Sequence, residues 1–263
     1  MEKTLRTAAT GLAAQQRFVE IIAHNLANVN TTSFKRVRPE FQDLLYERLR
    51  TLGATAPQDV MESVHEVQIG SGTELVATTR SFAQGDLQPT NNPLDLAING
   101  DGFFVVRRPD GTVLYTRDGS FRLDREGRIV SSHGYVLEPG IVVPEDTAEL
   151  RISRDGVVTA VMAGGTTEQV LGQVYLARFI NPAGLRAVGE NLYAETVASG
   201  PPLLETPGQG SAGEILQAHL ESSNVELVEE MVNLIMAQRA YELNAKSIRT
   251  ADELLQTAVN LKS

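Results

Sequence analysis

The chain has 263 residues, 42% of them hydrophobic, and a formal net charge of −10 from Lys+Arg 23 against Asp+Glu 33. That length can bury a core in one large domain or in two smaller ones, and no apolar run approaches the roughly 18 residues of a membrane span. The acidic balance argues against nucleic acid as the main partner, and the absence of cysteine excludes disulfides, thiolate zinc sites and cysteine nucleophiles.

The residues from Thr4 to about Asn28 predict an amphipathic helix, because their apolar side chains recur with helical spacing. The apolar positions form two rows with a spacing of seven: Leu5, Leu12, Val19 and Leu26, and beside them Met1, Ala8, Ile22 and Val29. Residues 23–32 are rich in Asn and Thr, which favour the end of a helix over its interior. The rows predict packing against a second helix.

A different pattern occupies residues 73–199, where short apolar runs alternate with turns and predict a central antiparallel β-rich domain. Gly after Asp accepts the positive φ of a tight turn, which predicts hairpins at four dipeptides: Asp101-Gly102, Asp110-Gly111, Asp118-Gly119 and Asp155-Gly156. Three of the runs predict strands: 103–106, 140–143 and 173–176. Residues 34–72 and 200–219 are predicted to be connecting, extended segments.

The last part of the chain, residues 220–263, predicts the longer helix. Ser223 and Glu226 have the spacing of a capping box, which satisfies the free N–H groups at a helix start. Apolar residues beyond the box again form two rows: Leu227, Leu234, Tyr241, Ile248 and Leu255, and beside them Met231, Ala245 and Val259. Together with residues 1–33 this helix predicts a coiled-coil domain and an α+β fold, while packing on the chain's own globular domain is the alternative.

No pattern in the sequence is typical of catalysis. His24, His65, His133 and His219 match no metal-ligand spacing. Residues 208–213 have the glycine spacing of a dinucleotide site, but they follow a loop rather than a strand, so they predict a linker. We therefore predict no catalytic residue, no cofactor, no metal and a structural protein that is not an enzyme. A β-domain hydrolase with helical extensions and a monomeric binding module are the alternatives from other classes.

Three motifs resemble those of the flagellar rod and hook axial protein family. The first spans residues 10–16, residues 25–31 and residues 33–36, with Asn25, Leu26, Ala27, Asn28, Phe34 and Lys35. The second spans residues 85–104 and 115–121, and the third residues 220–225 and 238–246, with Gln238, Arg239, Ala240 and Tyr241. His24 and Ser33 depart from the family's Asn and Gly, and Ser33 indicates a turn that does not require a conformation open to glycine only.

The resemblance covers almost the whole chain and implies a subunit of a helical polymer. In this family the terminal helices are expected to form an inner coiled-coil layer around an export channel, with the β-domain outside. The length and residues 41–63 resemble the distal rod, and a proximal rod or hook-type subunit is the alternative within the family. The implied function is structural: a rigid tube that transmits torque across the periplasm to the hook.

The same resemblance implies partners and a location. The expected partners are further copies of the chain, proximal rod subunits, the hook or hook–rod junction, the surrounding periplasmic and outer-membrane ring proteins and the flagellar type III export apparatus. Nucleic acid is not expected among them. The expected location is the periplasm-spanning rod of the flagellar basal body, which the chain would reach without a cleaved signal peptide.

We expect the helix rows to make the subunit interface, and the residues concerned are Leu5, Leu12, Val19, Ile22, Leu26, Leu227, Met231, Leu234, Tyr241, Ile248 and Leu255. The first helix would pack on the last through these rows. Residues 41–63 would stiffen the shaft, and the β-domain would present an acidic exterior to a surrounding ring.

Overall fold

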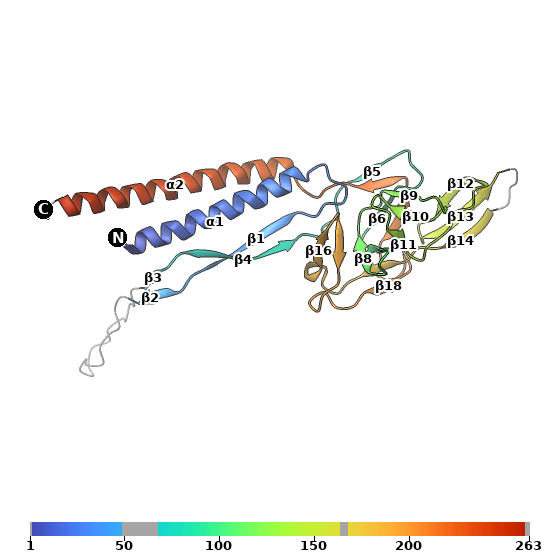
Figure 1. Cartoon of the computed structure of the whole chain (residues 1–263), viewed down its shortest axis with the longest axis horizontal. Coiled ribbons are helices and arrows are strands. Elements are labelled where there is room, and N and C mark those ends of the chain that lie inside the picture. The colour runs from blue at the N-terminus through green and yellow to red at the C-terminus, as the bar shows by residue number, and fades with distance from the viewer. Residues whose placement is uncertain (1, 49–67, 164–167, 261–263) are drawn as a thin grey trace, which may run out of the picture. The chain divides into compact units, whose positions relative to one another are not determined.

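The computed structural model describes residues 2–48, 68–163 and 168–260, which divide into two compact units. The helical unit is drawn from residues 1–26, 37–79 and 226–263, and the β unit from residues 27–36 and 80–225. Helices near both ends of the chain and a β-rich region between them make the fold α+β, as predicted (Figure 1). The finer division into three parts stays a prediction.

The helical unit contains the α-helices of the described residues, α1 (Glu2–Ala27) and α2 (Leu227–Asn260), and four strands. The strands are β1 (Val37–Asp43), β2 (Tyr46–Arg48), β3 (Gln68–Gly70) and β4 (Thr73–Arg80). β1 pairs with β4, and β2 pairs with β3 in antiparallel register. The β1–β4 ribbon lies along α1, where the rings of Phe18 and Phe41 meet edge to face at 6.2 Å (Figure 1).

The predicted capping box is wrong, because α2 begins after Glu226 rather than after Ser223. The Ser223 hydroxyl accepts a hydrogen bond from the N–H of Val225, which closes a turn before the helix. The side chain of Asn224 is also engaged elsewhere: it accepts from the N–H of Arg36 at 2.7 Å. These contacts hold residues 223–225 in a non-helical conformation, so the helix begins later.

Within its described residues, the β unit contains sixteen strands and one short 3₁₀ helix, η1 (Pro182–Gly184). The strands are β5 (Leu87–Pro89), β6 (Leu96–Asn99), β7 (Phe103–Arg107), β8 (Val113–Thr116), β9 (Phe121–Leu123), β10 (Ile129–Ser131), β11 (Val136–Leu137), β12 (Thr147–Ile152), β13 (Val157–Met162), β14 (Glu168–Gln173), β15 (Leu176–Arg178), β16 (Arg186–Gly189), β17 (Leu192–Ala194), β18 (Leu203–Glu205), β19 (Glu214–Gln217) and β20 (His219–Glu221).

Nine of these strands form the main sheet, in the order β16-β17-β8-β7-β11-β10-β9, with β15 beside β7 and β18 beside β15. β12, β13 and β14 make a separate antiparallel sheet, while β19 pairs with β6 and β20 with β5. β7 is buried on both faces, because successive side chains of a strand point to opposite sides. Phe104 and Val106 enter the larger apolar core, and Phe103 and Val105 enter a smaller aromatic one.

Two of the four predicted hairpins are confirmed. Asp110-Gly111 lies between β7 and β8 and Asp155-Gly156 between β12 and β13, and both glycines have positive φ. The other two predictions are wrong, because β6 pairs with β19 and β9 with β10. Gly119 instead allows close backbone approach, since a Cβ there would lie 1.6 Å from the carbonyl oxygen of Leu96.

The predicted strand at 103–106 is confirmed as part of β7, whereas the run 173–176 spans the end of β14 and the start of β15. The strand predicted at 140–143 is wrong. Those residues follow a turn in which Gly140 has a φ of 79°, and only Val142 makes a bridge, to Arg128.

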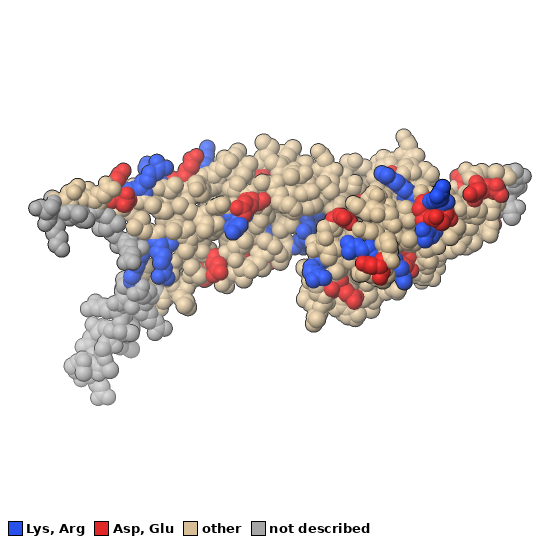
Figure 2. Space-filling model, viewed as in Figure 1, with Lys and Arg blue, Asp and Glu red and all other residues tan. Residues whose placement is uncertain are grey.

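The surface of the β unit is mixed in charge on the face that Figure 2 displays, where basic and acidic side chains are interspersed. The expected acidic exterior is therefore not seen on that face. Neither described helix is long and apolar enough to cross a membrane. Of the segment expected to stiffen the shaft, residues 49–63 lie outside the described residues.

Candidate assembly interface

The contact between α1 and α2 is built from small side chains. Gly11 of α1 lies against Asn244 of α2, and a Cβ on this glycine would be 3.0 Å from the Asn244 Nδ2 atom. On the same side of α2, at intervals of seven residues, Ala237 and Ala251 are buried. Residues seven apart lie on one side of a helix, and Gly11 leaves room at this point for the side chain of Asn244.

Asn25 ties the end of α1 to the start of β1. Its buried side chain donates to the carbonyl oxygen of Val37 at 2.9 Å and accepts from the N–H of the same residue at 3.0 Å. The same amide nitrogen lies 3.5 Å from Oε1 of Glu230, a buried carboxylate of α2. An amide side chain suits this position because it is both donor and acceptor.

The predicted interface residues lie at different depths. Ile22 is buried, whereas Leu5, Leu12, Val19, Leu26, Leu234 and Ile248 are half-buried and Leu227, Met231 and Tyr241 are exposed. The side chain of Leu255 lies outside the described residues. Val19 and Tyr241 come together, since both line a hollow of about 320 Å³ with Gln16, Gln238 and Glu242.

The motif residues also lie at different depths. Asn25, Phe34 and Lys35 are buried, Leu26, Asn28 and Ala240 are half-buried, and Ala27, Gln238, Arg239 and Tyr241 are exposed. Within one chain, the centre of the helix contact is therefore the small-residue row of Ala237, Asn244 and Ala251. The larger apolar residues of the predicted α2 rows flank that contact or face outward.

α2 carries a stripe of exposed apolar side chains over its first turns. Its members are Leu227, Val228, Met231, Val232, Ile235 and Met236, whose exposed fractions lie between 46% and 67%. We call them the α2 stripe. Contiguous exposed apolar side chains on a soluble chain mark an interaction surface, because leaving them in water is unfavourable.

A buried charge cluster holds the segment that follows α1 inside the β unit. Lys35 Nζ donates to Glu221 Oε1 at 2.7 Å and to the carbonyl oxygen of Ala83 at 2.8 Å. Arg117 Nε donates to Glu221 Oε2 at 2.8 Å, and the N–H of Gly85 donates to Glu221 Oε1 at 2.9 Å. Arg117 also donates to three backbone carbonyls, those of Ile98, Gly100 and Gly102.

The three charged side chains are almost completely removed from water, with 0% of Lys35 and Glu221 and 3% of Arg117 exposed. Burial, together with the nearby Arg117, lowers the pKa of Lys35 to about 8, although Glu221 opposes the change. Burial alone would raise the pKa of Glu221. Arg117, Lys35 and the N–H of Gly85 outweigh burial, and they hold that pKa below its ordinary value.

The turn before Phe34 requires the left-handed conformation that glycine adopts readily. Ser33 has a φ of 55°, a left-handed conformation that favours glycine but that serine also adopts, so the turn is not restricted to glycine, as predicted. Two hydrogen bonds offset the strain. The buried Ser33 hydroxyl donates to the carbonyl oxygen of Arg117 at 2.8 Å, and its N–H donates to that of Glu221 at 2.8 Å.

The sequence singled out Lys35 but not its two partners. Arg117 lies in the motif at residues 115–121 and Glu221 in the motif at residues 220–225, so each motif contributes one charge. The presence of one charged residue in each motif was therefore the only hint in the sequence. It could not show that the three residues pair with one another, because a motif does not reveal whether its charged side chain is buried or solvated.

Comparison with known proteins gives the family. The model "Flagella basal body rod protein" matches residues 5–35, "Flagellar hook protein FlgE/F/G D1 domain" matches residues 97–160, and "Flagellar basal body rod FlgEFG protein C-terminal" matches residues 216–261. The flagellar basal-body rod protein FlgG of Borreliella burgdorferi is 46% identical over 264 residues, covering 100% of this chain and 99% of that protein. The chain belongs to the FlgG family.

Other relatives agree with this family. FlgG of Caulobacter vibrioides is 44% identical over 261 residues, covering 99% of this chain and 100% of that protein. The hook protein FlgE of Salmonella typhimurium is 46% identical over 119 residues, but these are only 45% of this chain and 29% of the hook protein. This FlgG-family chain is therefore a structural subunit of the flagellar distal rod and is located in the basal-body rod.

The FlgG relatives are structural rod proteins, and no catalytic constellation is seen in the described part of this chain. In residues 2–48, 68–163 and 168–260, no group of three His, Cys, Asp or Glu side chains could hold a metal ion. The described part of this FlgG-family chain instead has apolar packing surfaces and the buried cluster of Lys35, Arg117 and Glu221.

We predict that Glu221→Gln lowers the free energy of unfolding of the β unit by about 3–5 kcal/mol, because Lys35 and Arg117 would stay buried without a counter-charge. Glu149→Gln is the matched control, since Glu149 and its partner Arg151 are more than half exposed, and it should leave the free energy of unfolding nearly unchanged. Urea unfolding followed by circular dichroism measures both. Equal losses would contradict the anchoring role of the cluster.

The Lys35 pKa predicts a dependence of stability on pH. The unfolded chain keeps the Lys35 proton up to about pH 10.5, whereas the folded chain releases it near pH 8. In that window the unfolded state binds more protons, so the contribution of Lys35 to stability rises with pH. The stability of the wild type relative to Lys35→Met should therefore increase from pH 8 to about pH 10, measured by urea unfolding.

Burial and Glu195 raise the pKa of Tyr115 from 10.0 to about 12, but Tyr115 is present in both variants, so its contribution cancels in their difference. The folded state keeps that proton where the unfolded state loses it, so Tyr115 acts in the opposite direction above pH 10. A difference between wild type and Lys35→Met that does not change below pH 10 would refute the assignment.

Substitutions of Ser33 separate strain from hydrogen bonding. Ser33→Ala removes the bond to Arg117 and keeps the left-handed strain, so it should destabilise the chain by about 1–3 kcal/mol. Ser33→Gly loses the same bond but relieves strain of roughly 1 kcal/mol, so it should destabilise less. Thermal unfolding of the two variants checks the order, and the reverse order would show that backbone strain at this turn is unimportant.

Proposed function

We propose that the chain polymerises through its terminal helices into a rigid helical tube that encloses the export channel. The tube would act as a drive shaft and transmit torque across the periplasm to the hook. The observation that carries this proposal is the α2 stripe. A single chain pairs α1 with the small-residue row of α2 and leaves the stripe in water, so a neighbouring subunit is the natural cover.

The energetics favour assembly. Burying each Leu, Ile, Val or Met of the stripe contributes roughly 1.5–3 kcal/mol, and six such side chains lie close together on α2. These gains must exceed the loss of translational and rotational freedom, which costs at least about 4 kcal/mol. In a polymer each subunit makes several such contacts, so the free energy gained by burial exceeds this cost more readily than in a dimer with one contact.

The inner layer of the tube would be a coiled coil. The regular interval of Ala237, Asn244 and Ala251 supports this proposal, since residues seven apart lie on one side of a helix. The larger apolar residues on either side of that row, such as Tyr241 and Met231, would then pack between subunits. The predicted rows thus remain our proposal for the interface in the assembled rod.

The proposed partners are the flagellar components that adjoin the distal rod. They are other copies of this chain, proximal rod subunits, the hook or its junction, the surrounding ring proteins and the flagellar type III export apparatus. The relatives' names, flagellar basal-body rod protein, support association with flagellar components. We propose no enzymatic activity for the chain, because its surfaces suit packing and its relatives are rod proteins.

We predict that Met231→Asp abolishes tube formation, because it places a charge within the stripe where a neighbour would exclude water. The monomer should stay folded, since Met231 is 49% exposed. Ser247→Asp is the matched control, which adds the same charge to the same helix at an exposed polar position and should keep the tubes. Negative-stain electron microscopy and circular dichroism check both variants. Normal tubes from Met231→Asp would refute the stripe as an assembly face.

A further inference from the structure

Asn99 and Gly100 form the one Asn-Gly dipeptide of the chain, at the point where β6 ends. Asparagine before glycine is prone to deamidation, because glycine has no Cβ to hinder attack by its backbone nitrogen. In this reaction the Gly100 nitrogen attacks Cγ of Asn99 and loses its proton, the side-chain amide leaves as ammonia, and a cyclic succinimide forms. Water then opens the ring to aspartate or isoaspartate. Asn99 is exposed, so water reaches the site.

The side chain of Gln84 engages both reacting groups. Its Oε1 atom accepts a hydrogen bond from the N–H of Gly100 at 2.9 Å, and its Nε2 atom donates to Oδ1 of Asn99 at 3.4 Å. The first bond holds the proton that the nitrogen must release when it attacks. The second restricts rotation of the Asn99 side chain, which must turn its Cγ atom toward that nitrogen. One glutamine makes both bonds because its amide is both donor and acceptor.

The backbone on either side of Gln84 is held by the buried charge cluster. Lys35 Nζ donates to the carbonyl oxygen of Ala83, and the N–H of Gly85 donates to Oε1 of Glu221. Gln84 itself is exposed, but the residues before and after it are fixed by these bonds. Its side chain therefore leaves the main chain from a defined position beside β6.

The peptide that joins Asn99 to Gly100 is also held from the side of the sheet. Arg117 Nη1 donates to the carbonyl oxygen of Gly100 at 2.9 Å, and Asn99 pairs with Glu214 of β19. A Cβ on Gly100 would lie 2.9 Å from Cα of Gly213, so the two backbones are in close contact. Closure of a succinimide needs the main chain to turn at Asn99, and these contacts oppose that turn.

We propose that Asn99 is a deamidation site and that Gln84 protects it in the folded chain. The reaction proceeds in the unfolded chain and wherever the contact with Gln84 is lost. This inference concerns the β unit of a single chain, so it does not depend on the proposed assembly.

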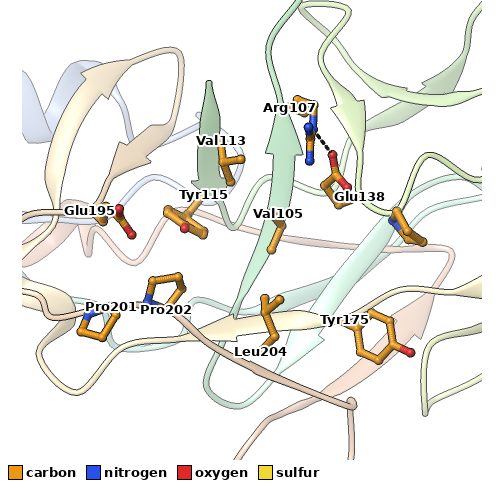
Figure 3. A pocket seen from close by; sticks show the side chains of 11 residues that line it. Val105, Arg107, Val113, Tyr115, Glu138, Tyr175, Glu195, Pro201, Pro202 and Leu204 are labelled. Atoms are coloured by element: carbon orange, nitrogen blue, oxygen red, sulfur yellow. Dashed lines mark hydrogen bonds and ion pairs between the residues drawn. The ribbon is translucent and has the colours of Figure 1, made fainter. Parts of the chain in front are cut away.

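Deamidation here would disturb β7, the strand that both apolar cores share. An aspartate at position 99 would face Glu214 across the β6–β19 pair, where like charges are destabilising. Isoaspartate would also lengthen the main chain shortly before β7. Val105 and Arg107 of β7 line an apolar hollow of about 580 Å³ (Figure 3), so a shift of this strand would alter that surface as well as the cores.

Mass spectrometry of aged protein tests the proposal. Folded wild type, Gln84→Ala and Gln88→Ala are incubated at mildly alkaline pH, and trypsin then releases residues 81–107 as one peptide. We expect Gln84→Ala to deamidate at Asn99 roughly tenfold faster than wild type, because it loses both hydrogen bonds. Gln88→Ala, which changes an exposed glutamine of β5, should match wild type.

Two further comparisons sharpen the result. Wild type unfolded in urea should deamidate at Asn99 faster than the folded chain. Gln84→Glu keeps an acceptor for the N–H of Gly100, so it should deamidate more slowly than Gln84→Ala, and circular dichroism establishes that both variants are folded. Equal rates for folded Gln84→Ala and folded wild type, or for folded and unfolded wild type, would overturn the proposal.

Amide hydrogen exchange gives a readout that does not depend on the deamidation reaction. The N–H of Gly100 should exchange slowly in wild type and in Gln88→Ala, and faster in Gln84→Ala, which lacks its acceptor. A Gly100 amide that exchanges at the same rate in all three folded proteins would overturn the protective role of Gln84.

Discussion

The ion pairs of Glu221 with Lys35 and Arg117 are the constraint on which the organisation of the β unit depends. They join residues separated by 186 and 104 positions in the chain. Lys35 lies in the segment that follows α1, and Glu221 lies in β20, shortly before α2. One buried carboxylate therefore fixes both segments that lead to the terminal helices, and Arg117 ties them to carbonyl groups of β6 and of the loop between β6 and β7.

A buried ion pair is a weak means of adding stability, because taking the charges out of water costs several kcal/mol per ion. Its physical effect is selective: the cluster is satisfied only when all three segments meet in one register, and a mispaired segment leaves a charge unpaired. The left-handed Ser33 and the bonds of Asn224 to Arg36, Ser81 and Ala83 act in the same direction.

The apolar surface of α2 has a simple structural cause. α2 has apolar side chains on more than one side, and α1 covers only the side of Ala237, Asn244 and Ala251, so the α2 stripe stays exposed within one chain.

The sequence by itself determined the two terminal helices, the β-rich region between them and the family, because helical periodicity and short motifs are local properties. The alternation of apolar runs and Asp-Gly turns likewise predicted the hairpins at Gly111 and Gly156. Tertiary structure alone decided that Gly119 serves a close backbone approach and that Ser33 is left-handed. It also decided which face of α2 meets α1 and that Lys35, Arg117 and Glu221 are buried together. These features depend on contacts between residues far apart in the chain, and neither the periodicity nor the composition of a single segment records which distant segment will cover it.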